Sequence, residues 1–242
     1  MACLVEARNL SKSYGPVTVL QETSFCIEKG MSILWAPNGA GKTTLIRIIL
    51  GITRPDKGEI VFRKPKSIGI ALEKEPVPSH ATVADLILFG TLGKDREPSL
   101  EEATKILETL GLGRETLTRR IHELSTGMRR KALIAQALIG DPELIVLDEP
   151  FSGLDPASRI KISLLLNRLR DKGTDMIIAT HTLSLLDPDN LYTIDNHRVK
   201  GPYHIHGTRT ITAINPANGE ATTTTPTQAI NLYKQGYIII DA

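Results

Sequence analysis

Near-continuous apolar runs mark the segments that we expect to be buried strands. Residues 31–34, 144–147 and 175–179 are runs of this kind, and each is followed by a polar stretch. Strands buried on both faces of a parallel sheet have this pattern, because neither face meets water. Ligands of open α/β sheets bind at the carboxyl ends of the strands. The pattern therefore predicts an α/β fold with functional residues at the ends of these three strands.

Shorter patterns predict the rest of the core. Further strands are expected over 4–10, 24–28, 59–62 and 67–72, and helices over 45–50, 132–139 and 157–172. From Thr82 to Leu117 apolar residues recur every three or four positions with no strand between them. We interpret this stretch as part of a helical subdomain, at about 74–135, inserted in the α/β core.

Beyond Pro188 the pattern weakens. Strands at 191–194 and 198–199 flank a turn, and the segments 208–214 and 220–225 predict a hairpin. A helix over Thr227–Lys234 and a strand over 237–240 would complete a small β-rich appendage at 208–242, after a main domain at 1–207. The threonines at 222–225 also admit a disordered linker. His204 and His206 alternate, and without a third ligand we expect them to be solvated rather than metal-bound.

Composition limits the possible classes. The 242 residues are 41% hydrophobic, enough to bury the core of one α/β domain, and the net charge of +2 indicates no commitment to nucleic acid. Cys3 and Cys26 form no C-x-x-C pair, so we expect two reduced thiols in a cytosolic protein. We also expect neither a signal segment nor a membrane span, because no apolar run approaches 18 residues.

The stretch Trp35-Ala36-Pro37-Asn38-Gly39-Ala40-Gly41-Lys42-Thr43-Thr44-Leu45 follows the first buried run and precedes a helix. Strand, glycine-bearing loop and helix form the context of a phosphate-binding loop, whose backbone N–H groups and helix N-terminus hold anionic phosphates. Lys42 would reach the β- and γ-phosphates, and Thr43 would ligate magnesium. An ordinary surface turn is the alternative. The motif expects glycine at Ala36, so the backbone there either avoids a positive φ or stores strain.

Other polar groups follow the remaining strands. Asp148 and Glu149 end one buried run, where the first suits a magnesium ion and the second suits polarising an attacking water. His181 ends another, beside the expected nucleotide. Ser125 is expected to cap a helix and to leave free N–H groups as a second anion site, although a plain capped helix with a basic first turn is possible. Tyr14 is either an adenine-stacking aromatic or a strand-end residue.

Together these residues resemble the ATP-binding subunit of an ATP-binding cassette (ABC) transporter, over about residues 4 to 200. Five motifs occur in the family's order: 36–44 resembles its phosphate loop, Leu124-Ser125-Thr126-Gly127-Met128 its signature motif, 144–149 its Walker B strand, 152–155 with Asp155 its D-loop, and His181 its switch histidine. Tyr14 falls at the position of its adenine-stacking aromatic. The resemblance implies a P-loop NTPase (RecA-like) core with an N-terminal antiparallel β subdomain and an inserted helical subdomain.

The resemblance also implies function. ATP and Mg²⁺ would be bound by Tyr14 and by the loop residues Asn38, Gly39, Ala40, Gly41, Lys42, Thr43 and Thr44, with Asp148 at the metal and Glu149 and His181 catalytic. Ser125, Thr126, Gly127 and Met128 would serve the ATP of a second nucleotide-binding subunit in a head-to-tail homodimer or heterodimer. Separate integral membrane subunits would be the other partners, with the chain peripheral on the cytoplasmic face of the membrane.

Besides Ala36, three positions depart from the family pattern. Glu73 stands where a glutamine is expected, and although a carboxylate can still ligate magnesium, it adds negative charge near the γ-phosphate. Thr126 and Met128 replace glycine and glutamine in the signature motif. Leu-Ser-x-Gly-Met followed by basic residues resembles exporter-type subunits, so the implied function is an ATPase that energises an exporter.

Two alternatives belong to other classes. One is a soluble ABC-type mechanical ATPase of DNA repair or translation, although the sequence has neither a long coiled-coil insertion nor a tandem cassette. The other is a degenerate cassette that binds ATP and regulates without hydrolysis, as Ala36 and Glu73 would allow. Intact Lys42, Asp148, Glu149 and His181 argue against it.

Overall fold

The three apolar runs form neighbouring strands of the central sheet, so their ends lie side by side. A computed structural model of the chain describes residues 3–63, 65–74, 77–78, 80–90, 98–183, 186–204, 211–214, 221–224, 235 and 238–240. Its six-stranded sheet has the order β5-β6-β7-β3-β8-β9. The strands are β3 (Met31–Trp35), β5 (Ile68–Ala71), β6 (Leu144–Asp148), β7 (Asp175–Thr180), β8 (Asn190–Asp195) and β9 (Arg198–His204). All neighbouring pairs are parallel except β8 and β9.

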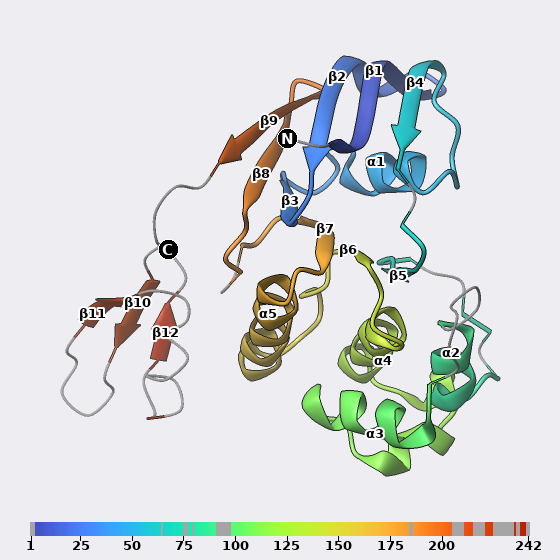
Figure 1. The fold of residues 1–242 in the computed structure, drawn as a ribbon, viewed down its shortest axis with the longest axis vertical. Coiled ribbons are helices and arrows are strands. Elements are labelled where there is room, and N and C mark those ends of the chain that lie inside the picture. The colour runs from blue at the N-terminus through green and yellow to red at the C-terminus, as the bar shows by residue number, and fades with distance from the viewer. Residues whose placement is uncertain are drawn as a thin grey trace.

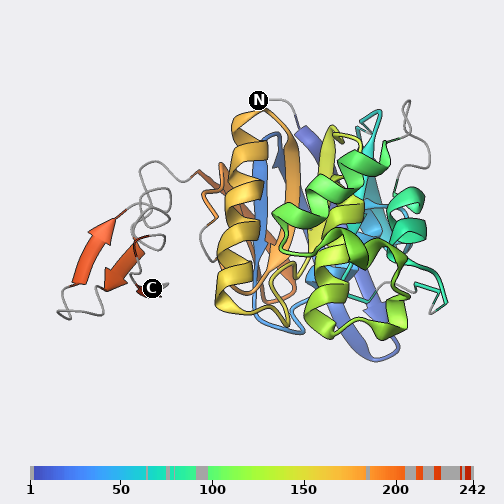
Figure 2. The same ribbon diagram turned by 90° about the horizontal axis from the view of Figure 1, so that it is seen from below.

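Both faces of this sheet are buried, as the apolar runs predict. Ile145 and Leu147 of β6 pack into one core, and Leu144 and Val146 pack into the other. The first core also holds α4 (Thr126–Leu138) and α5 (Pro156–Asp171), and the second holds α1 (Lys42–Ile49). Figure 1 shows α1 and the helices α4 and α5 on opposite sides of the sheet, and Figure 2 shows α5 along its length.

A second, antiparallel sheet covers α1 from outside. Its order is β2-β1-β4, with β1 (Cys3–Tyr14), β2 (Val17–Glu28) and β4 (Lys57–Phe62). The sheet packs on α1 through side chains such as Val5, Leu20 and Ile27, which are all fully buried. Both N-terminal strands are longer than the alternating pattern predicts. The extension of β1 places Tyr14 at the very end of that strand.

The expected helical insertion lies between β5 and β6. It contains α2 (Val83–Phe89), α3 (Leu100–Thr109), the short 3₁₀ segments Arg114–Thr118 and Ile121–Glu123, and α4. Thr82 and Asp85 form a capping box at the start of α2, and Ser99 caps α3. Residues 91–97, between α2 and α3, lie outside the described part of the chain.

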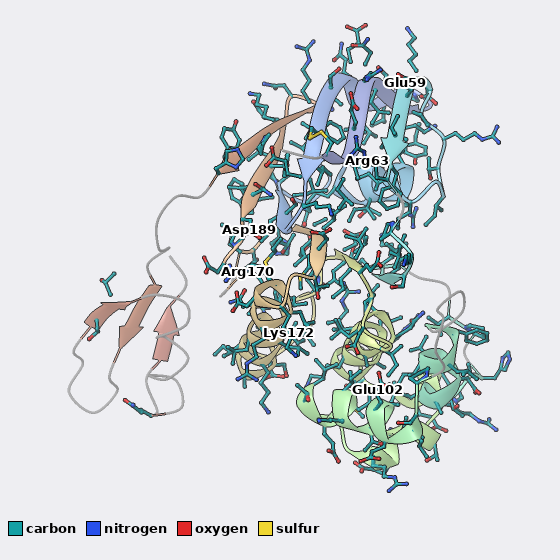
Figure 3. The ribbon with its side chains drawn as sticks, viewed as in Figure 1. Glu59, Arg63, Glu102, Arg170, Lys172 and Asp189 are labelled. Carbon is teal, nitrogen blue, oxygen red and sulfur yellow. A yellow bond between two sulfur atoms is a disulfide. The ribbon has the colours of Figure 1, made fainter. Side chains whose placement is uncertain are left out.

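Charged side chains hold the amino ends of the strands at the edge opposite the site. The Asp189 carboxylate accepts a hydrogen bond from the Met31 N–H at 2.7 Å, and Arg170 of α5 forms an ion pair with Asp187 at 3.0 Å. Figure 3 labels Arg170 and Asp189 near each other. These contacts anchor the start of β3, whose far end carries the phosphate loop.

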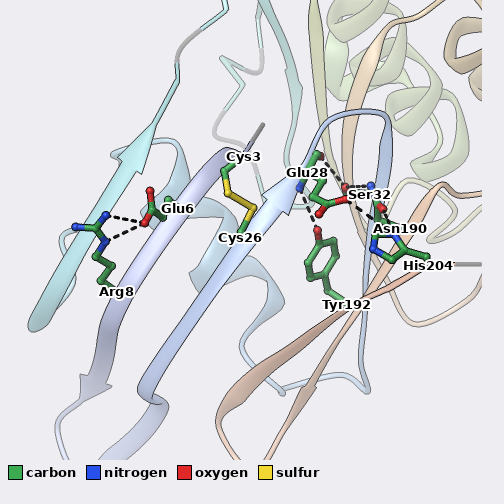
Figure 4. The surroundings of a disulfide bond; sticks show 9 residues. All are labelled: Cys3, Glu6, Arg8, Cys26, Glu28, Ser32, Asn190, Tyr192 and His204. Atoms are coloured by element: carbon green, nitrogen blue, oxygen red, sulfur yellow. Dashed lines mark hydrogen bonds and ion pairs between the residues drawn. A yellow bond between two sulfur atoms is a disulfide. The ribbon is translucent and has the colours of Figure 1, made fainter. Parts of the chain in front are cut away.

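The cysteines correct one expectation. Cys3 of β1 and Cys26 of β2 form a disulfide, so the prediction of two reduced thiols is wrong. They lie next to each other because the paired strands bring their Cα atoms to 5.5 Å, the separation that a disulfide requires. Figure 4 shows the bond between the two strands, with Tyr192 and His204 nearby. A spacing of 23 residues could not reveal this pairing before the strand register was known.

The C-terminal part forms a separate small sheet. Strand β10 (Ile211–Ile214) pairs antiparallel with β11 (Ala221–Thr224), as the predicted hairpin requires, and with β12 (Ile238–Ile240). The predicted helix over Thr227–Lys234 and His206 lie outside the described residues. His204 is exposed to solvent, and its Nδ1 lies 3.2 Å from Asn190 Oδ1.

Candidate functional site

A cavity of about 450 Å³ opens at the carboxyl ends of β3, β6 and β7. These strands are neighbours in the order β6-β7-β3, so the residues that follow them meet at one edge of the sheet. Of the residues singled out from the sequence, the lining contains Tyr14, Asn38, Gly39, Gly41, Lys42, Thr43, Thr44, Glu73, Glu149 and His181. Ser152, the first residue of the expected D-loop, also lines it, and so do Val19 and Lys74, which were not predicted.

The loop between β3 and α1 depends on two glycines. Gly39 and Gly41 have φ values of 81° and 103°, in the left-handed region that side chains disfavour. At Gly41 a Cβ would also lie 2.7 Å from a methyl carbon of Val19, too close for any other residue. Ala40 completes the turn, and its N–H donates to the Pro37 carbonyl at 3.3 Å. The loop backbone therefore faces the cavity, with the start of α1 behind it.

Ala36 does not store strain. Its φ is not positive, and its side chain is 1% exposed and packs in the core beside α1. Of the two possibilities that the sequence left open, the structure therefore has an ordinary backbone conformation at this position.

Lys42 is held inside the loop. Its side chain is 5% exposed, and its ammonium donates to the carbonyls of Ala36 at 2.6 Å and Pro37 at 3.1 Å. The same nitrogen forms an ion pair with Glu149 Oε1 at 3.0 Å. The lysine therefore faces the catalytic candidate Glu149 across the strand ends.

Glu149 links Lys42 to His181. Its other carboxylate oxygen, Oε2, lies 2.8 Å from His181 Nδ1 and accepts a longer bond of 3.4 Å from the His181 N–H. Glu149 has a φ of 50°, which is uncommon for a residue with a side chain and directs the chain sharply away from β6. A buried carboxylate thus lies between an ammonium and an imidazole, where it can exchange partners.

Thr43 and Asp148 form a pair of oxygen donors. The Thr43 hydroxyl donates to Asp148 Oδ2 at 2.7 Å, and Asp148 is completely buried. Burial raises the pKa of the Asp148 carboxyl above its ordinary value; the Thr43 hydrogen bond opposes this, while the negative charges of Glu149 and Glu73 add to it. This environment disfavours the charged form in the absence of a cation.

These donors fit a magnesium ion. Asp148 Oδ1 is buried and accepts no hydrogen bond from the described residues, and Glu73 is close enough to act on its charge. A hard cation prefers carboxylate and hydroxyl oxygens and keeps several waters. Within the described ranges no group of three His, Cys, Asp or Glu side chains could hold a metal. The ion would therefore need further oxygens, such as those of bound phosphates.

Tyr14 borders the same cavity. Its ring is 49% exposed, and Lys12 lies over it with its nitrogen 5.3 Å from the ring centre. Lys12 also pairs with Asp56 at 2.7 Å. One face of the ring is thus occupied by a cation, and the ring remains available to stack on a flat ligand.

The signature residues lie outside this cavity. Ser125 caps α4 by accepting from the Met128 N–H at 3.3 Å, which confirms the predicted cap, and Thr126, Gly127 and Met128 form the first turn. Thr126 lines a second cavity of about 420 Å³ with Glu73, Arg130 and Ser152. Asp155 caps α5 by accepting from the Ser158 N–H, and the Ser158 hydroxyl, followed by this N–H, lowers the pKa of its carboxyl. The structure does not bring these residues to the chain's own phosphate loop.

Arg130 is a residue that the sequence analysis missed. The basic first turn suggested an external anion, but the Arg130 side chain is 5% exposed and turns inward. Its guanidinium donates to the carbonyl of Leu72, 3.1 Å away, and to that of Asp148. The side chain thus joins α4 to the ends of β5 and β6. Arg130 differs from the neighbouring Arg129 only in that its side chain is buried. The mixed polarity of the helical sequence pattern does not indicate this difference.

Comparisons with known proteins agree with this geometry. The family described as "ABC transporter" matches residues 20–152, more than half of the chain. The chain is similar to "Nod factor export ATP-binding protein I" of Mesorhizobium japonicum, with 38% identity over 190 residues covering 73% of this chain and 56% of that protein. It is also similar to "Fe(3+) ions import ATP-binding protein FbpC" of the same organism, with 32% identity covering 73% of this chain and 53% of that protein. The chain thus spans little more than half the length of these relatives.

Solved structures share the fold. A nucleotide-free ATP-binding cassette from an ABC transporter superposes with a TM-score of 0.67 at 27% identity, covering 85% of this chain and 92% of that one. A dimeric bacterial ABC transporter cassette gives a TM-score of 0.75 at 20% identity, covering 84% and 99%. Along the described ranges, no helix combines the length and apolar character needed to cross a bilayer.

Proposed function

The chain belongs to the ABC transporter family as an ATP-binding domain, and from this premise we propose that it hydrolyses ATP to energise a membrane transporter. The observation that carries the proposal is the convergence of Lys42, Glu149 and His181 in one cavity at the strand ends. Each group comes from a different strand end, so their meeting is a property of the fold and not of one motif.

Nucleotide binding would begin with the loop and Tyr14. The left-handed glycines turn loop N–H groups toward the phosphates, and Tyr14 offers an aromatic face for the adenine. Lys42 would then exchange its carbonyl and carboxylate partners for the β- and γ-phosphates. Thr43, Asp148 and Glu73 would hold a magnesium ion, which would neutralise developing phosphate charge.

The partner exchange at Lys42 prepares Glu149 for chemistry. Once the ammonium turns to the phosphates, Glu149 Oε1 loses its ion pair and can accept a proton from an attacking water. His181, held at 2.8 Å, keeps the carboxylate oriented and lies on the cavity wall, where it can contact the γ-phosphate. Nucleotide binding and activation of the water would thus be coupled through one side chain.

The position of the signature residues supports a head-to-tail pair. Ser125 caps α4 and Thr126 to Met128 form its first turn, outside the chain's own cavity, so this helix start would complete the site of a second subunit. We propose that this subunit is a further ATP-binding domain and that both act on separate membrane subunits at the cytoplasmic face. The chain would serve an exporter, because Met128 and the basic residues after it are of the exporter type. Relatives named for both export and import leave the direction to experiment.

The Glu149→Gln variant tests this proposal. It should keep the affinity for ATP, since the glutamine removes little ground-state binding, and slow hydrolysis by a factor on the order of 10² to 10⁴. The slowed protein should accumulate as a dimer with ATP and magnesium in light scattering, and adding Ser125→Arg should dissociate it. The exposed Glu101→Gln and Thr109→Arg substitutions of α3 serve as matched controls. Turnover at the parent rate in the Glu149 variant would refute the role of this residue.

A further inference from the structure

Trp35 is the one tryptophan of the chain and the last residue of β3. Its side chain is 41% exposed, although it directly precedes the buried Ala36. The indole N–H donates to the main-chain carbonyl of His181 at 3.1 Å. The ring is not among the residues that line the nucleotide cavity, so its contact with the candidate site passes through His181.

This bond extends the pairing between β3 and β7 past the end of the sheet. Trp35 and Thr180 are opposite each other in the parallel ladder, and the Ala36 N–H donates to the Thr180 carbonyl at 3.4 Å. His181 follows directly after β7, where the sheet offers its carbonyl no further partner. The Trp35 side chain takes this place. Two consecutive carbonyls of the histidine segment are therefore held by two consecutive residues at the start of the phosphate loop.

The neighbouring turn leaves that carbonyl facing Trp35. The Thr180 hydroxyl donates to the Thr182 carbonyl at 2.9 Å and accepts from the Thr182 N–H at 3.1 Å. Both bonds bypass His181 and close a tight local turn around it. The carbonyl of His181 takes no part in these two bonds and accepts from the indole instead.

The other anchor of His181 is a side chain that takes part in the proposed reaction. The histidine N–H and ring both contact Glu149 Oε2, at 3.4 and 2.8 Å. In the proposed reaction, Glu149 Oε1 loses Lys42 and accepts a proton from water, so the charge of the carboxylate that holds His181 changes in each cycle. Trp35 takes no part in that exchange. The bond from the indole to the His181 carbonyl can therefore persist through the cycle while the imidazole moves.

We propose that Trp35 is a positioning residue for His181, tying the histidine backbone to the first residues of the phosphate loop. The inference rests on the proposed function, because it assigns Trp35 a part in the same ATP site. Its consequence is that loss of the indole N–H should misplace His181 without weakening the nucleotide contacts. It should therefore lower kcat more than it raises KM.

The first experiment is Trp35→Phe in the full chain, which keeps an aromatic ring and removes the N–H donor. We expect kcat for ATP hydrolysis to fall about 10-fold with KM changed less than about 2-fold. The freed carbonyl is near solvent, so the melting temperature should stay within about 2 °C of the parent value. Tyr203→Phe, which alters an aromatic residue of β9 that is 49% exposed, is the matched control and should change nothing.

A double-mutant cycle separates positioning from a general structural effect. In a His181→Ala background, Trp35→Phe should have no further effect on the residual rate, because its target side chain is gone. Multiplicative losses, or an unchanged kcat in the single variant of an active protein, would overturn the inference and leave the proposed function intact. A parent chain that neither binds nor hydrolyses ATP would overturn both.

A second measurement needs no turnover. One tryptophan gives one indole N–H resonance, and a hydrogen-bonded N–H exchanges with water at least about 10-fold more slowly than a free one. We expect this protection in the nucleotide-free chain and in Glu149→Gln saturated with ATP and magnesium. Solvent-like exchange in the ATP-bound variant would show that the indole bond does not persist in the ATP-bound state. This result would reject the inference even if Trp35→Phe were poorly folded.

Discussion

The buried carboxylate of Asp148 destabilises the fold when no cation is bound, but it would be a ligand for a bound magnesium ion. Its Oδ1 has no hydrogen-bond partner in the described part of the chain, and Glu149 and Glu73 place further negative charge nearby. Neutralising Asp148 should therefore help the empty fold, whereas a bound cation should need the charge.

We expect Asp148→Asn to raise the melting temperature of the nucleotide-free chain by about 2–4 °C at pH 7. The sign follows from linkage: a carboxyl whose pKa is raised on folding binds more protons folded than unfolded, so stability falls as pH rises from its ordinary pKa to the raised one. The variant lacks this loss, and its advantage should grow over the same window. Melting curves from pH 4 to 8 test this, with Asp195→Asn at an exposed carboxylate as the control. An advantage independent of pH would contradict the argument.

Ala36 gives a second prediction at this scale. Because its backbone is unstrained and its methyl group is buried, Ala36→Gly should lower the free energy of unfolding by about 0.5–1 kcal/mol through added chain entropy. ATP affinity should not improve. Denaturant unfolding and calorimetry measure the two effects, and tighter ATP binding with unchanged stability would show that the alanine stores strain after all.

At the scale of elements, α4 is joined to the sheet by an internal contact. The Arg130 guanidinium satisfies the carbonyls that end β5 and β6, the strands that lead to Glu73 and Glu149. A shift of α4, whose first turn bears the signature residues, would therefore be transmitted through Arg130 to both strand ends. A lysine could not make the same contact, since its single ammonium lacks the planar fork of donors.

Arg130→Met should destabilise the chain by about 2–4 kcal/mol, because it removes two buried hydrogen bonds that the guanidinium donates. Arg130→Lys should recover only part of this loss. The control is Arg168→Met, at an exposed position in the last turn of α5. Urea unfolding gives the comparison, and equal effects at the two positions would contradict the internal role of Arg130.

At the scale of the whole molecule, the C-terminal sheet contributes no described residue to the lining of the candidate site. Every described residue that lines the nucleotide cavity lies between Tyr14 and His181, whereas β10, β11 and β12 pair only with one another in the sheets described. The small sheet shares no strand pairing with the other two sheets, which is consistent with an accessory role outside the ATP site.

Deleting residues 208–242 should leave ATP affinity and basal hydrolysis within about 2-fold of the parent values, while changing dimerisation or its regulation. Nucleotide titration, a coupled ATPase assay and light scattering test this directly. Loss of ATP binding in a deletion variant that still melts cooperatively would contradict the separation of the two units.

Local pattern alone determined much of the fold. The three apolar runs became β6, β7 and β3, since a run that is buried on both faces has few alternatives, and the loop glycines predicted a backbone that only glycine adopts readily. Lys42, Glu149 and His181 could be expected near one another for the same reason. Each follows a parallel strand, and parallel strands deliver their ends to one edge.

Only the tertiary structure decided which partners these residues have. The strand register joined Cys3 to Cys26, the packing of α4 turned Arg130 inward, and the end of β7 left the His181 carbonyl to Trp35. These contacts link positions 23, 58 and 146 residues apart. Hydrophobic periodicity describes which face of an element is buried, but contacts across such distances depend on the register and orientation of elements once packed, which no local pattern contains.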